Sequence, residues 1–284
     1  MVIIDINGEN VEQFATYMGQ DMAENLGREF YHGIAVMSDS EEEFLAGIVW
    51  EYMNMEDKAD TESVIEWLKI LDPEATELLF SSYKDAVSNA RVVRSKVVIP
   101  VEDSQNEKKA LKDAGFKVRL TEGDHIIVNL SELSALPFMA SRKVPGNIRV
   151  LNQLPLRQFR KGLSKCVEIG KKGICEDLSY LSMNWFEADV SCFAKTDDTI
   201  SGFFLFHKLP SGMLSMQLMV GMDKNAQQNL LGMMRLFVIS MEEKYSPDTK
   251  ILLDRHNQAS LMLSEKLLPR SFGIPVYSGS REEA

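Results

Sequence analysis

The order of predicted elements occurs twice along the chain, and this repetition constrains the fold more than any other feature. Two strands, a helix, a strand, a helix and a strand follow one another in residues 44–130 and again in residues 201–279. Gly47 and Gly202 lie 202 − 47 = 155 residues apart, and Lys96 and Lys250 lie 250 − 96 = 154 residues apart. Because the two offsets agree within one residue, we predict an internal duplication.

The stretch between the two halves has the composition of a linker. Residues 137–147 contain Pro137, Pro145 and Gly146, which interrupt regular structure. We therefore predict an α/β (α+β) chain with two domains, residues 1–136 and 148–284, joined by a linker at 137–147. Pattern also predicts a single helix after Asn10, a helix begun by Asp72 and Pro73, and a helix over residues 176–193. The last of these would bury one face made of Leu178, Leu181, Trp185, Ala188 and Cys192.

Charge and composition narrow the class of partner. The formal charge is −11, from 42 acidic against 31 basic residues, which disfavours nucleic acid and favours a cationic small molecule. No apolar run is long enough to span a membrane, and the N-terminus lacks the features of a secretion signal, so we expect a cytoplasmic protein with no membrane partner. The three cysteines and four histidines show no metal-ligand spacing, and no metal is expected.

One motif resembles a known family. After the strand-like run at 250–254 come Asn257, Ser260 and Leu263, spaced as N-x-x-S-x-x-L. This resembles the second motif of the GNAT superfamily of acyl-CoA N-acyltransferases, and the repeated unit resembles a tandem pair of such domains over nearly the whole chain. The resemblance implies, for each half, a mixed, mostly antiparallel sheet flanked by helices. It also implies acetyl-CoA, or another acyl-CoA, as co-substrate.

The resemblance assigns the acyl-CoA to the second half. The first half has Asp72, Glu74 and Glu77 where the family has a glycine-rich phosphate loop, and these acids would repel a pyrophosphate. We expect that half to be degenerate, with a structural or substrate-shaping role. In the second half the pantetheine would lie beside Leu218, Met219, Val220 and Asn257. The pyrophosphate would rest on the loop and first turn made of Gly221, Met222, Asp223, Lys224, Asn225, Ala226 and Gln227.

The predicted chemistry departs from the family pattern. Where the family has a tyrosine that protonates the thiolate, this chain has Leu111 in the first half and Ser264 in the second. Leucine cannot donate a proton, and serine donates only weakly or through a water. His207 is the candidate base, with an ordinary surface histidine at a strand end as the alternative. Gln217 is a candidate for orienting the substrate.

Two acidic residues in the first half form a second candidate site, for binding a substrate. Glu51 and Glu66 lie on adjacent predicted strands, where they would hold an amine as a carboxylate pair or simply face solvent. Two functions stay open at this point. One is an acyl-CoA-dependent N-acyltransferase that transfers an acyl group directly to a small-molecule amine. The other is a catalytically inactive GNAT-like protein that binds a ligand or another protein; a monomer and a homodimer are both compatible with the sequence.

Overall fold

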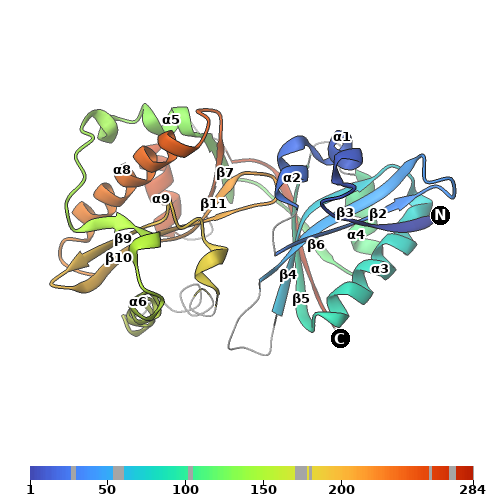
Figure 1. The fold of residues 1–284 in the computed structure, drawn as a ribbon, viewed down its shortest axis with the longest axis horizontal. Coiled ribbons are helices and arrows are strands. Elements are labelled where there is room, and N and C mark those ends of the chain that lie inside the picture. Colours follow the sequence, from blue (N-terminus) through green and yellow to red (C-terminus); the bar gives the residue numbers. More distant parts are fainter. Residues whose placement is uncertain are drawn as a thin grey trace. The chain divides into compact units, whose positions relative to one another are not determined.

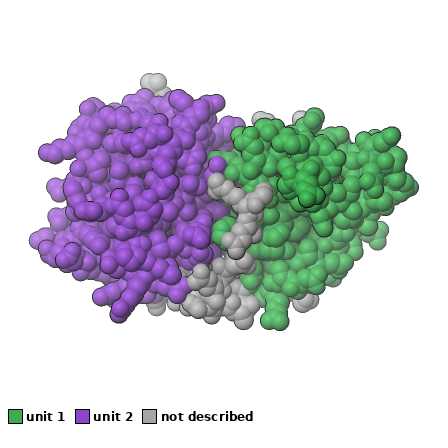
Figure 2. Space-filling model, in the orientation of Figure 1, with its two compact units in different colours: residues 1–124, 210–212, 273–284 green, residues 125–209, 213–272 purple. Residues whose placement is uncertain are grey.

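The chain forms two compact units, which we describe separately (Figure 2). The computed structural model describes residues 1–26, 30–53, 61–101, 105–169, 178, 181–255, 258–268 and 273–283. Unit 1 comprises Met1–Asp124, Pro210–Gly212 and Gly273–Ala284, and unit 2 comprises His125–Leu209 and Met213–Phe272. Within the described part of the chain, no helix has the length and apolar character needed to cross a membrane.

Unit 1 is built on a seven-stranded sheet with the order β1-β2-β3-β4-β5-β13-β6 (Figure 1). Its strands are β1 (Val2–Ile6), β2 (Tyr31–Met37), β3 (Phe44–Met53), β4 (Thr61–Ile70), β5 (Val92–Pro100), β6 (Lys117–Thr121) and β13 (Val276–Glu282). All neighbouring strands are antiparallel except β4 and β5, which are parallel. The sheet is therefore mixed and mostly antiparallel, as the resemblance implied.

Helices cover unit 1 through two separate cores. The core that includes Trp50 and Ile65 packs against α3 (Thr76–Asn89) and α4 (Gln105–Asp113). The second core joins the other face of the sheet to η1 (Val11–Phe14), α1 (Ala15–Met18) and α2 (Gln20–Asn25). The single helix predicted after Asn10 is wrong: Asn10 makes no side-chain cap, and Gly19 separates α1 from α2 with φ of 89°. Asp72 does act as the predicted cap, since its carboxylate accepts from the Glu74 amide at 2.9 Å ahead of η2 (Pro73–Ala75).

Unit 2 repeats this plan on a six-stranded sheet with the order β7-β12-β11-β10-β9-β8 (Figure 1). Its strands are β7 (His125–Asn129), β8 (Ile148–Val150), β9 (Cys192–Thr196), β10 (Thr199–Lys208), β11 (Leu214–Gly221) and β12 (Lys250–Asp254). Among the pairings of the described residues, β11 with β12 is parallel and the others are antiparallel. Its helices include α5 (Leu130–Ser134), α6 (Leu156–Glu168), α8 (Ala226–Lys244) and α9 (Gln258–Leu267).

The predicted helix over 176–193 is wrong where the structure describes it. Trp185 closes a short 3-10 helix, η5 (Met183–Trp185), which Ser182 caps through its side chain, and Cys192 begins β9. The apolar residues of this stretch are buried one by one against the sheet, and this irregular packing happened to match a helical spacing. Periodicity alone does not distinguish the two cases.

The two halves of the chain exchange one strand each. β7 comes from the N-terminal half but pairs with β12 in unit 2, and β13 comes from the C-terminal half but lies between β5 and β6 in unit 1. The compact units therefore differ from the contiguous ranges 1–136 and 148–284. The predicted linker at 137–147 is also packed: Met139 is buried, and the Phe138 carbonyl accepts from the Arg235 guanidinium on α8 at 2.9 Å.

Candidate functional site

In each sheet the pairing between the two parallel strands ends before the strands do, which leaves a slot between them. In unit 1 the parallel pairing of β4 with β5 ends at Ile65 and Val97, whereas β4 continues to Ile70. In unit 2 the pairing of β11 with β12 covers only Leu214 and Ser215, whereas β11 continues to Gly221. The later backbone groups of β4 and β11 therefore face a slot on that side. No strand fills either slot in the described part of the chain.

Each of the two strands that border a slot, β4 and β11, contains a β-bulge. The extra residue of each bulge is a predicted substrate residue. Val49 pairs with Trp67 and Trp50 with Ile65, which leaves Glu66 as the extra residue of β4. In the same way Leu205 pairs with Leu218 and Phe206 with Met216, which leaves Gln217 as the extra residue of β11. A bulge leaves a backbone amide outside the ladder and turns the strand locally. Glu66 and Gln217 are therefore equivalent positions in the two units.

The bulge also changes which residues of β11 share a face. Strict alternation along the strand would place Gln217 on the face opposite Leu214, Met216, Leu218 and Val220. Since Cα partners in an antiparallel pair share a face, the register places Leu218 on the same face as Ser215 and Gln217. That expected alternation is wrong after position 216, because the inserted residue shifts the period by one.

Glu51 and His207 occupy a second pair of equivalent positions. Glu51 pairs with Val64, two residues before the bulge at Glu66, and His207 pairs with Ser215, two residues before the bulge at Gln217. Each therefore lies on the same face of its sheet as the bulge residue that follows. Four side chains selected from the sequence thus occupy two matching pairs of positions, one pair in each unit.

The candidate site of unit 1 is a carboxylate pair in which Glu51 is buried and Glu66 is half-buried. Glu51 is only 2% exposed, so the solvent-facing alternative is wrong for this residue. Burial raises the pKa of Glu66 well above its usual range, and the charge of Glu51 raises it further. On the opposite face, the Tyr83 hydroxyl lies 2.9 Å from the hydroxyls of both Ser63 and Ser95. Burial raises the pKa of Tyr83 to about 12.

The slot of unit 1 is occupied by the protein itself. The Glu107 carboxylate, 3% exposed, accepts a hydrogen bond from the Ile70 amide at 3.0 Å, and the Asn106 side chain donates to the Ile70 carbonyl at 3.4 Å. The amides of Leu71 and Asp72 both donate to the Leu45 carbonyl. The end of β4 therefore has its hydrogen bonds made by side chains of α4 and by β3.

The loop between β11 and α8 in unit 2 is ordered by Asp223. Its carboxylate accepts from the Asn225 amide at 2.9 Å and from the Thr196 hydroxyl at 2.7 Å. The Met222 amide donates to the Ser201 carbonyl and the Ala226 amide to the Asp223 carbonyl, so three of the predicted phosphate-binding amides, those of Met222, Asn225 and Ala226, are already engaged. Lys224 and Gln227 are exposed at the start of α8, where amide groups and a positive dipole favour an anion.

Gly221 lets α8 begin directly against the end of β11. A Cβ atom at this position would lie 2.6 Å from the Cβ of Ala226, closer than side chains pack. The backbone at Gly221 therefore approaches the first turn of α8 in a way that only glycine permits. Leu218, Met219 and Val220 precede it along the side of β11 that faces the slot.

His207 is buried on β10, which pairs with β11 on the side away from the slot. Its exposure is 2%, so the alternative of a surface histidine at a strand end is wrong. Its Nδ1 lies 2.6 Å from the Trp185 carbonyl, and its ring stacks on the Trp185 indole at a centroid distance of 3.7 Å. Beside it, the Gln217 amide donates to the Ser215 hydroxyl at 3.0 Å. The structure therefore brings His207 and Gln217 to one polar face through Ser215.

The remaining predicted residues do not join this face. The Ser264 hydroxyl is buried and donates to the Leu261 carbonyl at 2.8 Å, one turn back in α9. Asn257 lies outside the described residues. Leu111, at the corresponding place in unit 1, is fully buried in the apolar core. Trp185, which the sequence placed in a helix face, is the contact of His207 that sequence reasoning missed, because only the tertiary fold joins them.

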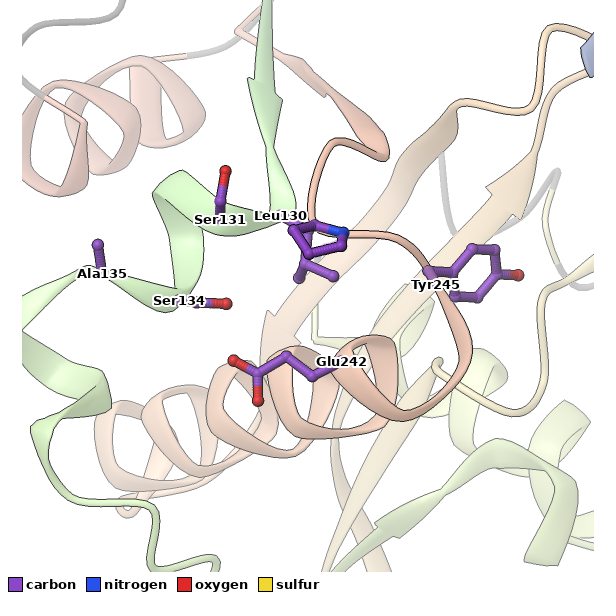
Figure 3. A pocket seen from close by; sticks show the side chains of 7 residues that line it. Leu130, Ser131, Ser134, Ala135, Glu242 and Tyr245 are labelled. Carbon is purple, nitrogen blue, oxygen red and sulfur yellow. The ribbon is translucent and has the colours of Figure 1, made fainter.

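A surface pocket of about 470 Å³ lies elsewhere in unit 2, between α5 and the C-terminal end of α8 (Figure 3). Glu242 and Ser134 point toward one another across it. The pKa of Glu242 is lowered by its bond to Arg142 and, to a smaller extent, by Ser134. Glu242 lies 16 residues after Ala226 on the same helix, roughly 24 Å along its axis. The pocket is therefore separate from the slot.

Solved structures define the fold as a tandem GNAT fold. The chain superposes on a tandem GNAT protein from the clavulanic acid biosynthesis pathway with a TM-score of 0.60 and 10% identity, covering 100% of this chain and 98% of that one. FemX gives a TM-score of 0.57 at 10% identity over 98% of this chain and 97% of its own. A GCN5-related N-acetyltransferase from Sphaerobacter thermophilus gives 0.54 at 12% identity over 99% and 95%. No family model matches the chain, and no curated protein does.

Proposed function

We propose that the chain is an acyl-CoA-dependent N-acyltransferase, with acetyl-CoA as the favoured donor, and that unit 2 binds the donor. The observation that carries the proposal is the contrast between the two slots. In unit 1 the Ile70 amide donates a hydrogen bond to Glu107, a residue of the protein itself. In unit 2, β11 continues beyond its last parallel pair to Gly221, and no described strand pairs with it on the side of the slot. An extended pantetheine arm pairs with backbone groups of this kind.

The unit 2 geometry supports direct transfer to an amine. The bulge at Gln217 offers a backbone amide outside the ladder, which suits the oxyanion that develops on a thioester carbonyl. The amine nitrogen forms the new bond to the carbonyl carbon as the C–S bond breaks. His207 takes the proton from the amine, and Gln217 orients the acceptor. With the acidic net charge of −11, we favour a cationic small-molecule amine as acceptor and no nucleic acid.

A specific observation favours the second candidate, a protein that binds acyl-CoA or another ligand without catalysis. The Ser264 hydroxyl, at the place of the family's proton donor, gives its hydrogen to the Leu261 carbonyl. A thiolate leaving group would then take its proton from solvent. Binding of the donor and turnover are therefore tested separately.

Titration calorimetry with acetyl-CoA, compared with free CoA, tests the donor site. We expect one-to-one binding by the wild-type chain. Lys224→Glu should weaken it about tenfold, because one charge-assisted contact to a phosphate is replaced by repulsion. Lys84→Glu, an exposed change of the same charge on α3 of unit 1, is the matched control. Equal weakening by both variants would contradict the assignment to unit 2, and binding without acetylation of any amine would favour the second candidate.

A further inference from the structure

Trp185 touches the imidazole of His207 in two ways. Its backbone carbonyl lies 2.6 Å from Nδ1, and its indole ring lies parallel to the imidazole, with 2° between the ring planes. A carbonyl oxygen only accepts, so Nδ1 carries the proton of the neutral ring and the lone pair is on Nε2. The contact therefore fixes both the plane of the ring and its tautomer.

The segment that carries Trp185 is fastened to the strand that carries His207. The Glu187 amide donates to the Phe206 carbonyl at 2.9 Å, and the Phe206 amide donates to the Ser191 hydroxyl at 2.9 Å. The Trp185 ring is held in turn by an edge contact with Phe186 at 5.2 Å. The carbonyl and the indole therefore keep a fixed place relative to β10.

The indole N–H is a polar group that packing alone does not explain. Trp185 is 4% exposed, and its Nε1 has no hydrogen-bond acceptor among the described residues. Burying a donor without a partner is destabilising, so core packing alone does not account for this group. The Trp185 ring therefore lies beside the polar face of His207 and Gln217, and its stacking on His207 requires only an aromatic ring.

We propose that Trp185 is the positioning residue of the acceptor site, holding His207 as the Nδ1–H tautomer with its ring plane fixed. The inference rests on the proposed transferase function. In that reaction the amine proton passes to Nε2 of His207, the C–N bond forms, the C–S bond breaks, and the thiolate takes its proton from solvent. A base that rotates or changes tautomer no longer presents Nε2 to the amine, and a misplaced catalytic group costs about 10²-fold in rate.

Nitrogen-15 spectra of the histidine side chains in the free protein test the positioning without any substrate. We expect the His207 signal to report one tautomer, with the proton on Nδ1, in the wild type and in Trp185→Phe, which retains a stacking ring. Trp185→Leu keeps the backbone carbonyl but removes the ring that holds the imidazole against it, so the imidazole should turn away from the carbonyl part of the time and give a mixture of tautomers. Phe159→Leu is the matched control, because Phe159 belongs to the same aromatic cluster but contacts Phe186 and Phe203.

The second readout is acetyl transfer to whichever amine the wild type accepts, measured across pH. Trp185→Leu should lower kcat about 10²-fold and change the shape of the pH profile, with acetyl-CoA affinity unchanged and with rescue by Trp185→Phe. A Trp185→Leu protein with one Nδ1–H tautomer and a wild-type profile would overturn the inference. Absence of acetyl-CoA binding by the wild type would instead reject the proposed function, and the tautomer spectra alone would then decide the positioning.

Discussion

At the scale of single residues, each bulge residue shares a face of its sheet with a polar residue of the neighbouring strand. Glu51 and Glu66 in unit 1 correspond by register to His207 and Gln217 in unit 2. The residue types were readable from the sequence, and so was their position on strands. Their burial was not, because the sequence does not indicate which strand ends are covered.

The Glu66 carboxyl makes the stability of unit 1 dependent on pH. Its pKa in the folded chain lies above the ordinary value of 4.5, so the stabilisation is complete below that pH and is lost as pH rises through the raised pKa. The loss should be about 1.4 kcal/mol per pH unit in that window. Thermal unfolding across pH should show Glu66→Gln without this slope, while the exposed acid change Glu74→Gln should retain it. A slope identical in Glu66→Gln and the wild type would contradict the raised pKa of Glu66.

At the scale of elements, the joint between β11 and α8 depends on the close approach at Gly221. Gly221→Ala should force the start of α8 outward, cost about 1–3 kcal/mol of stability, and weaken acetyl-CoA binding. Gly146→Ala is the matched control within unit 2, since a Cβ there meets nothing within 4 Å. Denaturant unfolding and calorimetry of both variants check the prediction. Equal behaviour of the two variants would be inconsistent with a tight joint.

Sequence patterns predicted these elements unevenly, for physical reasons. The Asp72–Pro73 helix start was correct because a cap and a first-turn proline act locally. The helix drawn through Trp185 failed because burial against a sheet imitated a helical period. The two duplication anchors indicated the right element order but not the right alignment. Val64 and Ser215 are equivalent positions, and they pair with Lys96 and Leu252. Lys96 therefore corresponds to Leu252 and not to Lys250. The bulges, which set the true alignment, leave no mark in residue spacing.

At the scale of the whole molecule, the exchanged strands join the two halves. The sequence does not predict this exchange, because the residue pattern of a strand does not indicate which sheet it pairs with. β6 pairs only with β13 among the described residues, so unit 1 depends on the last strand of the chain. A fragment of residues 1–136 should therefore fail to fold as unit 1 does in the intact chain. The full chain ended at residue 272 should lose protection in unit 1 while unit 2 keeps it.

Limited proteolysis with mass spectrometry distinguishes these outcomes. Cleavage confined to residues 1–124 in the chain ended at residue 272 is the expected result. A fragment 1–136 that resists protease as well as the intact chain would show that β13 is dispensable, and the exchange would then be a matter of connectivity with little effect on stability.

Hydrogen–deuterium exchange of the intact chain, with and without saturating acetyl-CoA, tests the donor site of unit 2 most directly. We predict that bound donor protects residues 216–229, which include the bulge, the end of β11 and the first turn of α8. Residues 66–76, the equivalent stretch of unit 1 whose slot Glu107 occupies, should exchange at the same rate in both samples. Protection of residues 66–76 with none at 216–229 would contradict the assignment of the donor site to unit 2.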